Sequence, residues 1–188
     1  MPSVAMRIGS LVAAVVMTAI VTSCGAPQRS PDPQSNAHNA ADVTFAQKMI
    51  PHHQQALDMA AIVPSHTTNR KLIVMAKHIA LDQQAQIDTL QGLLQQWGEA
   101  QDHGEHHRMA MDGMVDAATM ERLPTLTGAE FDDLWLQSMI THHQGAVAMA
   151  EPEIAQGQDP TAVKMAKIIV EWQQFEIGQM HAMLGPAE

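Results

Sequence analysis

The chain carries an internal repeat, and this repeat limits the folds that it can adopt. The segment Met49–Ala60 reads MIPHHQQALDMA, and Met139–Ala150, 90 positions later, reads MITHHQGAVAMA. The same spacing relates Met75–Leu94 to Met165–Leu184 without a gap. Such self-similarity indicates two homologous halves that pack against each other. The densest part of the repeat is a histidine pair framed by methionines, so we expect two clusters of soft metal ligands in one fold.

The start of the chain has the pattern of a secretory leader. Arg7 precedes an apolar run, Ile8–Val21, that is too short to span a membrane permanently. Val21-Thr-Ser-Cys24 resembles the bacterial lipobox, in which cleavage precedes the cysteine and that cysteine then carries lipid. We therefore expect residues 1–23 to be a lipoprotein signal peptide and Cys24 to anchor the protein to the cell membrane, facing outside the cytoplasm. The alternative is an ordinary signal peptide followed by a chance thiol.

The amino-acid composition limits the kinds of partner that the protein can bind. Cys24 is the only cysteine, so no disulfide forms and no thiolate remains for a metal or for catalysis. Residues 24–39 are rich in Pro, Ser, Gln and Asn and should form a flexible tether. The formal net charge of −10 argues against nucleic acid and anionic lipid surfaces, because both bind basic faces. Contact with the membrane is thus expected through the lipid anchor only.

Residues 40–185 are predicted to form a single all-α domain. Ala, Leu, Met, Gln and Glu are abundant, Tyr is absent, and no stretch alternates in the manner of a strand. Helices are expected over about 40–62, 68–97, 127–155 and 159–184. A connector at 99–126 joins the two hairpins, which occupy about 40–98 and 127–185. Two related hairpins predict an antiparallel four-helix bundle.

Capping residues set the expected helix ends. Asn39 should cap the first helix and Pro64 should stop it. The sequence Thr127-Gly-Ala-Glu130 has the form of a capping box before the third helix. Asp159 followed by Pro160 should begin the fourth.

A helical wheel places the histidines and methionines of each repeat segment on one face. At about 100° per residue, these side chains of the first segment all fall within about 120° of one another. They are Met49, His52, His53 and Met59 in the first segment, and Met139, His142, His143 and Met149 in the second. Two such faces turned into one bundle would bring imidazoles and thioethers together near its pseudo-twofold axis.

The donor types favour a soft metal ion. Imidazole binds copper, zinc, nickel and iron, whereas the neutral thioether of methionine is a soft ligand that favours Cu(I). We therefore predict a copper site, with Cu(I) favoured over Cu(II) and other transition metals open. Methionines also fill irregular cores, and that reading is preferred for Met75 and Met165. For the histidine pairs, metal binding is preferred over core packing as the interpretation, because four buried imidazoles without partners would cost several kcal/mol.

The connector holds a second candidate cluster. Its potential ligands are His103, His106, His107, Met109, Met111 and Met114. Alternating Met and His in a loop resembles the methionine motifs of bacterial copper proteins, which can wrap a soft ion. A solvated loop of biased composition explains the same residues, and both interpretations remain open.

Polar residues occur on the otherwise apolar faces of the second and fourth helices. Gln83 and Gln173 occupy equivalent positions there, with Gln86 and Glu176 about one turn later. Buried polar side chains need partners, and ligating imidazoles usually donate their other N–H outward. These residues are thus candidates for hydrogen bonds to the histidines, with solvation at the bundle end as the alternative.

The paired Met-Ile-x-His-His segments, Gln-Gln-x-x-Ile in the second helix and Gly-Ala-Glu-Phe-Asp before the second histidine pair resemble the bacterial "domain of unknown function 305" family over about 40–185. The resemblance implies a ferritin-like four-helix bundle, secreted or lipid-anchored, with some members tied to copper binding and copper resistance. It carries over His52-His53 and His142-His143 as the family's histidine pairs, with Met49, Met59, Met139 and Met149 beside them.

Enzymatic alternatives find little support in the residues. A ferritin-like oxidase of the di-iron type uses Glu-x-x-His pairs, and none occurs in this chain. No Gly-x-Ser-x-Gly motif or phosphate-binding glycine loop occurs either. We expect a non-enzymatic, extracytoplasmic copper-binding lipoprotein that sequesters Cu(I) or transfers it to a copper-handling partner as yet unknown. A metal-dependent oxidase and a bundle that binds no metal are the alternatives.

Overall fold

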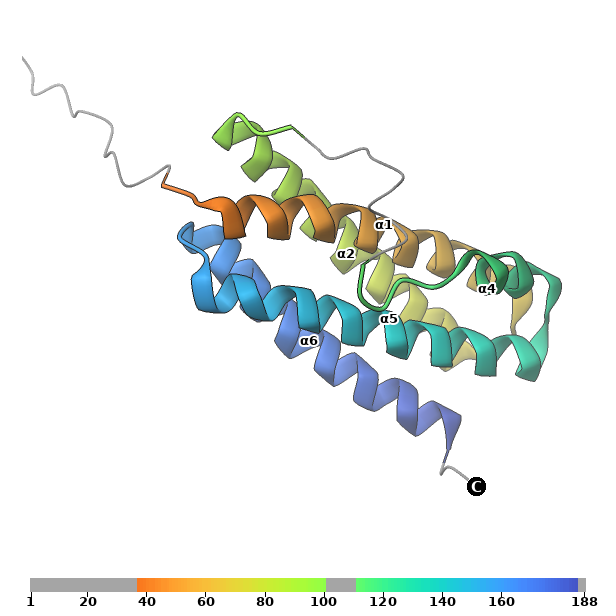
Figure 1. Ribbon diagram of the computed structural model, residues 1–188. Coiled ribbons are helices and arrows are strands. Elements are labelled where there is room, and N and C mark those ends of the chain that lie inside the picture. The colour runs from red at the N-terminus through yellow and green to blue at the C-terminus, as the bar shows by residue number, and fades with distance from the viewer. Residues whose placement is uncertain (1–36, 101–110, 186–188) are drawn as a thin grey trace, which may run out of the picture. The chain divides into compact units, whose positions relative to one another are not determined.

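The protein folds as a bundle of helices. The computed structural model describes residues 37–100 and 111–185, and these ranges contain helices and no strand (Figure 1). The long helices are α1 (Ala40–His66), α2 (Arg70–Trp97), α5 (Gly128–Gln156) and α6 (Pro160–Leu184). A short helix α4 (Ala117–Arg122) and the 3-10 turn η1 (Leu123–Thr125) precede α5. No helix of the described ranges is long and apolar enough to cross a membrane.

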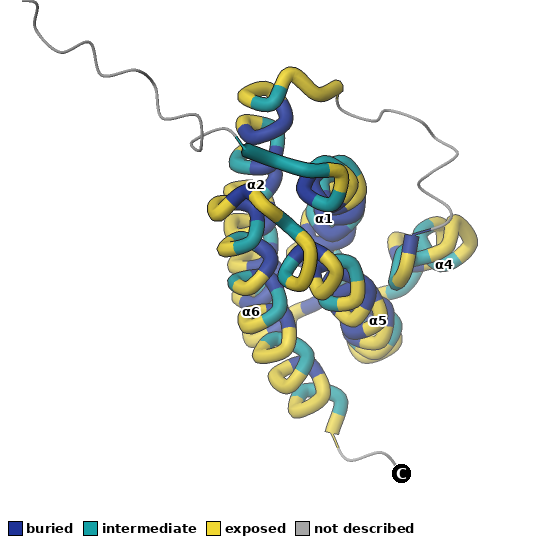
Figure 2. Tube along the Cα trace, turned by 60° about the vertical axis from the view of Figure 1, so that its left-hand side comes forward, coloured by how far each residue is buried: buried dark blue, intermediate teal, exposed yellow. Residues whose placement is uncertain are grey.

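The helices pair as two hairpins. α1 packs along α2, α5 packs along α6, and the contact of α1 with α5 joins the hairpins (Figure 2). The backbones of α2 and α6 approach each other at few points, although their side chains share one core cluster. The start of α1 packs with the end of α5 in one core cluster and the end of α1 with the start of α5 in another, so these helices are antiparallel. The all-α bundle expected from the sequence is confirmed.

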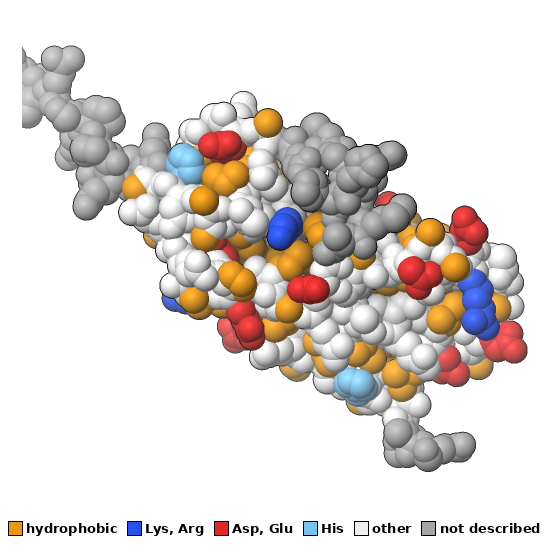
Figure 3. Space-filling model, viewed as in Figure 1, with side chains coloured by type: hydrophobic (Ala, Val, Ile, Leu, Met, Phe, Trp, Pro, Cys, Tyr) orange, Lys and Arg blue, Asp and Glu red, His pale blue; other side chains and the backbone are white. Residues whose placement is uncertain are grey.

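The core is divided by a polar layer. One apolar cluster surrounds Trp135 and Phe131, and the other surrounds Phe45 and Leu90. Along α1 and α5 the histidine pairs fall between the segments that build these two clusters. The four imidazoles therefore form a buried layer between two hydrocarbon layers. Acidic side chains are more widespread than basic ones on the face shown in Figure 3, in keeping with the net charge of −10.

Two of the expected helix starts form as predicted. The side chain of Asn39 accepts the N–H groups of Ala41 and Asp42, and Asp42 accepts the N–H of Asn39 in return, which makes a full capping box. Asp159 caps α6 by accepting the N–H groups of Thr161 and Ala162. Each cap satisfies amide groups that would otherwise have no partner at a helix start.

Two other local predictions are wrong. α1 continues past Pro64 to His66, because the proline removes only its own N–H and the amide of Thr67 still donates to the carbonyl of Val63. The side chain of Thr127 makes no capping bond at the start of α5. Gly128 has φ of 61°, outside the right-handed helical region, so the chain enters this helix along a path that a capping box does not fit.

The connector packs against the middle of the bundle. Its residues 111–116 lie close to α5, where a Cβ added at Gly145 would collide with the backbone of Asp112. Gly113, with φ of 75°, is equally confined, since a Cβ there would lie 2.6 Å from the carbonyl oxygen of Thr141. This close approach needs glycine on both sides. We call residues 111–116 the strap.

Candidate metal centre

The four histidines of the repeat meet inside the bundle. His52, His53, His142 and His143 are all fully buried. The ring centroids of His52 and His142 lie 3.8 Å apart, and each of these rings lies 6.3 Å from its neighbour in sequence. α1 and α5 run side by side in both ribbon views, which brings the two pairs together (Figures 1 and 2).

His53 and His143, which we call the outer histidines, bond to the flanking helices α2 and α6. His53 Nε2 lies 2.6 Å from Gln86 Oε1 on α2, and His143 Nε2 lies 2.9 Å from Glu176 Oε2 on α6. The sequence separation is 33 residues in both cases. The structure thus shows the contacts expected for these two polar residues. Each contact holds one ring nitrogen, and the other, Nδ1, is buried.

His52 and His142, the inner histidines, bond to backbone carbonyl groups. His52 Nε2 lies 3.2 Å from the carbonyl oxygen of Asp112 in the strap, and His142 Nε2 lies 3.0 Å from the carbonyl oxygen of His52. A carbonyl oxygen only accepts, so Nε2 carries the proton in both rings. In a neutral imidazole the lone pair then resides on Nδ1.

All four Nδ1 atoms are buried and have no hydrogen-bond partner in the described part of the chain. An unpaired buried polar atom costs about 1–3 kcal/mol, so native structures contain few of them. Four at equivalent positions of a repeat are hard to attribute to chance, and a bound ion is one of the standard explanations for such atoms. The four nitrogens thus have lone pairs or N–H groups without a partner among the described residues.

Burial favours the neutral form of three of these imidazoles. Burial lowers the pKa of His52 to about 3 and the pKa of His53 to about 4. It also lowers the pKa of His142 well below its usual value of 6.5, and the other imidazoles add to this effect. A metal binds the neutral ring, so at neutral pH His52, His53 and His142 need not lose a proton first.

The methionines of the repeat flank this layer, because Met49 belongs to the apolar cluster on one side of it and Met59 and Met139 belong to the cluster on the other. Met49, Met59 and Met139 are fully buried, and Met149 is half-buried. Residues 37–100 and 111–185 contain no group of three or more His, Cys, Asp or Glu side chains placed to hold one ion. Coordination in this layer would therefore combine imidazole nitrogen with thioether sulfur, which is a donor set for a soft ion.

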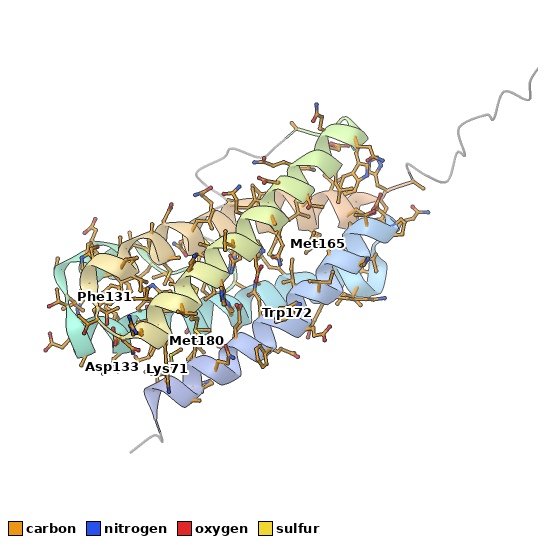
Figure 4. All side chains as sticks on the ribbon, turned by 180° about the vertical axis from the view of Figure 1, so that it is seen from behind. Lys71, Phe131, Asp133, Met165, Trp172 and Met180 are labelled. Atoms are coloured by element: carbon orange, nitrogen blue, oxygen red, sulfur yellow. The ribbon has the colours of Figure 1, made fainter. Side chains whose placement is uncertain are left out.

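Two glutamines expected to find partners remain unpaired. Gln83 and Gln173 are buried, and within the described ranges both amide atoms of Gln83 and the Oε1 of Gln173 lack hydrogen bonds. They line a cavity of about 400 Å³ between α2 and α6, together with Gln86 and Glu176. Figure 4 views this side of the molecule, where Met165 and Trp172 of α6 also border the cavity. The two residues that bond to the outer histidines, Gln86 and Glu176, thus border this cavity.

The connector cluster is only partly described. Met111 is buried and Met114 is half-buried, both in the strap. The remaining predicted connector ligands, His103, His106, His107 and Met109, lie outside the described residues, as does the predicted lipidation site Cys24. Met75, for which the sequence favours a place in the core, packs there beside Met180.

The sequence-based prediction missed the role of the strap. Gln55 Nε2 donates to the carbonyl of Val115, and the N–H of Val115 donates to Gln55 Oε1, both at 2.8 Å. Together with the bond of His52 to Asp112, this fixes the connector beside the histidine layer. The signal in the sequence is the replacement of Gln55 by Gly145 in the second repeat segment, which makes room for the strap.

Known proteins resemble this chain in sequence and structure. The model of the DUF305 family, a domain of unknown function, matches residues 42–184. A protein from Streptomyces coelicolor, assigned to DUF305 and to the secreted proteins, is 33% identical with a TM-score of 0.72 over 77% of this chain and 91% of its own. A DUF305 fragment from Deinococcus radiodurans is 34% identical with a TM-score of 0.72 over 78% of this chain and 97% of its own.

A third similar structure holds a metal. The Cu(I)-bound form of the protein CopM is 32% identical to this chain, with a TM-score of 0.63 over 74% of this chain and 91% of CopM. CopM has also been solved in Cu(II)-bound and Ag-bound forms. No curated protein matches the chain.

Proposed function

Because this chain belongs to the DUF305 family, we propose that it is an extracytoplasmic copper-binding lipoprotein that sequesters or transfers Cu(I) in metal tolerance. One observation carries the proposal. Four buried imidazoles each keep an unpaired Nδ1 atom, and buried methionines lie in the apolar clusters on both sides of them. The copper- and silver-bound forms of CopM support the choice of metal.

The donor set favours Cu(I) for this chain. Thioether sulfur is soft and neutral, so it adds little for hard cations and discriminates toward Cu(I). A core of this kind offers few charges to balance a higher oxidation state, because the ring contacts are mostly to neutral groups. The leader sequence and the lipobox-like Cys24 support a location outside the cytoplasm, where methionine ligands cannot be lost to disulfide formation.

Binding and transfer, not turnover, are proposed. The chain has no Glu-x-x-His pair for a di-iron oxidase, and the buried donors in the histidine layer and in the clusters beside it are imidazoles and thioethers. An oxygen-consumption assay on the copper-loaded protein tests this point directly. Steady oxygen-dependent turnover would replace the proposal with an oxidase.

A competition titration tests the metal site. The full chain is titrated with Cu(I) against a coloured Cu(I) chelator, and the double variant His52→Ala/His142→Ala is compared with it. We expect the double variant to lose the tightest sites, because these residues supply two of the four Nδ1 atoms. The matched control is His78→Ala/His181→Ala, which removes two exposed histidines and should keep the affinity.

The outcomes separate the candidate functions. Unchanged stoichiometry and affinity in the double variant would exclude the histidine layer and leave the connector as the site. No saturable binding by the unaltered chain would favour a bundle that binds no metal. Loss of fold is monitored by circular dichroism, and the unaltered protein should gain thermal stability on adding Cu(I), since a ligand bound only by the native state stabilises it.

A further inference from the structure

The two halves of the repeat differ in the side chain that bonds to the outer histidine. Gln86 bonds to His53 in the first half, and its counterpart Glu176 bonds to His143 in the second. This contact is otherwise parallel in the two halves, with the same sequence separation and the same unpaired Nδ1 on each ring. A carboxylate has thus replaced an amide at a single equivalent position.

This exchange fixes the tautomer of one ring only. A carboxylate oxygen accepts and cannot donate, so the Nε2 of His143 must carry a proton, and in the neutral ring that binds a metal the lone pair is then on Nδ1. An amide can turn either its oxygen or its NH₂ toward a ring, so Gln86 permits both tautomers of His53. His143 is therefore preorganised to bind through Nδ1, and His53 is not.

The exchange also puts a negatively charged side chain next to His143 and a neutral one next to His53. Among the hydrogen bonds that the four rings make within the described residues, only that of His143 goes to an acidic side chain. A cation in a buried layer is stabilised by a nearby opposite charge that is not exposed to solvent. The side chain of Glu176 is only 13% exposed, so its charge is only partly screened by water. A carboxylate behind an imidazole also raises the basicity of the ring as a ligand.

We propose that the second half of the repeat holds the tighter cation site and that Glu176 is the positioning residue responsible. Glu176 does not contact the ion in this proposal; it acts through the ring of His143. The first half, with Gln86 in the same place, binds more weakly and fills second. The inference rests on the proposed function, because it ranks two halves of the same histidine layer.

The repeat itself supplies the variants that test this ranking. Glu176→Gln gives the second half the contact of the first, and Gln86→Glu does the reverse. The double variant Gln86→Glu/Glu176→Gln exchanges the two contacts and keeps composition and net charge. Glu171→Gln, at an exposed position of α6, removes the same charge without touching a histidine and serves as the control.

Affinity is measured by competition between the full chain and a Cu(I) chelator. In Glu176→Gln the tightest affinity should fall by about tenfold or more with unchanged stoichiometry, in line with the loss of a partner behind a ligating histidine. Glu171→Gln should bind as the unaltered chain does. The exchanged double variant should recover one tight site.

Which half of the repeat binds the first ion is measured by ¹⁵N NMR of the imidazoles with substoichiometric Ag(I), a diamagnetic probe. Nδ1 of His143 should shift first in the unaltered chain, and Nδ1 of His53 should shift first in the exchanged double variant. A purely structural role for Glu176 would not move the first site to the other half. Thermal unfolding of each metal-free variant checks that the fold is kept.

Three results would overturn the inference. The first is an unchanged tightest affinity in Glu176→Gln, and the second is an equal loss in Glu171→Gln. The third is a first Ag(I) site that stays at His143 in the exchanged variant. Each of these leaves the proposed function intact, because metal still binds. Absence of saturable binding by the unaltered chain would instead reject the proposed function and the ranking with it.

Discussion

Gln55 binds both backbone groups of Val115, donating to its carbonyl and accepting from its N–H at 2.8 Å in each case. Two bonds from one side chain fix the strap in a single register on α1. That register places the carbonyl of Asp112 within 3.2 Å of His52 Nε2. A side chain one turn from the histidine pair thus determines which backbone group closes the histidine layer.

Gln55→Ala should release the strap. The variant loses two hydrogen bonds to partly buried backbone groups, at about 1–3 kcal/mol in total free energy of unfolding. The opening free energy that hydrogen exchange reports for the amide of Val115 should fall by at least the same amount. Urea unfolding measures the effect on global stability. Gln54→Ala is the control, because this exposed neighbour bonds only to Asp58 at 3.3 Å. Unchanged protection at Val115 would contradict the role given to Gln55.

Gly145→Ala should displace the strap from the other side. A methyl group at this position collides with the backbone of Asp112, and backbone cannot move aside without breaking the bond to His52. We expect a loss of about 2 kcal/mol or more in the free energy of unfolding, since overpacking typically costs about 1–3 kcal/mol. Chemical denaturation measures it.

Gly178→Ala is the matched control for this change. Gly178 lies in α6 with nothing within 4 Å of the added methyl group. Alanine there should stabilise the protein by about 0.5–1 kcal/mol, because it restricts the unfolded chain and suits a helix interior. The same substitution should thus have opposite signs at the two glycines. Equal effects would mean that the contact with Asp112 does not constrain the chain.

The repeat explains what the sequence could predict. Helical periodicity is local, so the amino-acid order alone places His52 and Met59 on one face, and it also predicts the capping by Asn39 and Asp159. The same order makes Gln86 and Glu176 candidates for bonds to the histidines, because ligating histidines need partners for their second nitrogen, and the structure decides between these bonds and solvation at the bundle end.

The strap could not be predicted in the same way. Its position depends on contacts between segments 60 residues apart, such as Gln55 with Val115, and no local pattern encodes them. Its sequence predicts only a loop of biased composition, because periodicity is absent there. The capping box predicted at the start of α5 was wrong for a similar reason. The positive φ of Gly128 depends on the direction in which the chain leaves η1, which the capping pattern does not describe.

The methionines of the repeat should contribute to metal affinity more than to stability. Met49→Leu/Met139→Leu keeps the volume of two fully buried side chains and should cost less than about 1.5 kcal/mol per site in the free energy of unfolding. Removal of both sulfurs should weaken Cu(I) binding, measured by chelator competition. Met75→Leu/Met165→Leu, at the repeat positions interpreted as core, is the control and should leave the affinity unchanged. Equal affinity in both double variants would limit the ligands to histidines.

A buried pair of acids links α1 to the turn between α5 and α6. Asp42 accepts the N–H groups of Gln158 and Asp159 as well as that of Asn39. Burial raises the pKa of Asp42, but these N–H bonds outweigh it and lower the pKa below its usual 3.8. Glu153, only 1% exposed, is affected in the opposite sense: burial and the negative charges of Asp42 and Asp159 raise its pKa to about 8.

Glu153→Gln should therefore flatten the pH dependence of stability. Because the folded-state pKa of Glu153 lies above its unfolded value of 4.5, its contribution is complete below pH 4.5 and is lost as the pH rises toward about 8. Glutamine stays neutral, so the variant should unfold at a higher temperature than the unaltered chain at pH 8 and differ little from it near pH 4.5. Thermal unfolding across this range measures the difference, with the exposed Glu151→Gln as control. A parallel pH profile for both proteins would mean that Glu153 ionises in the folded state as it does in the unfolded one.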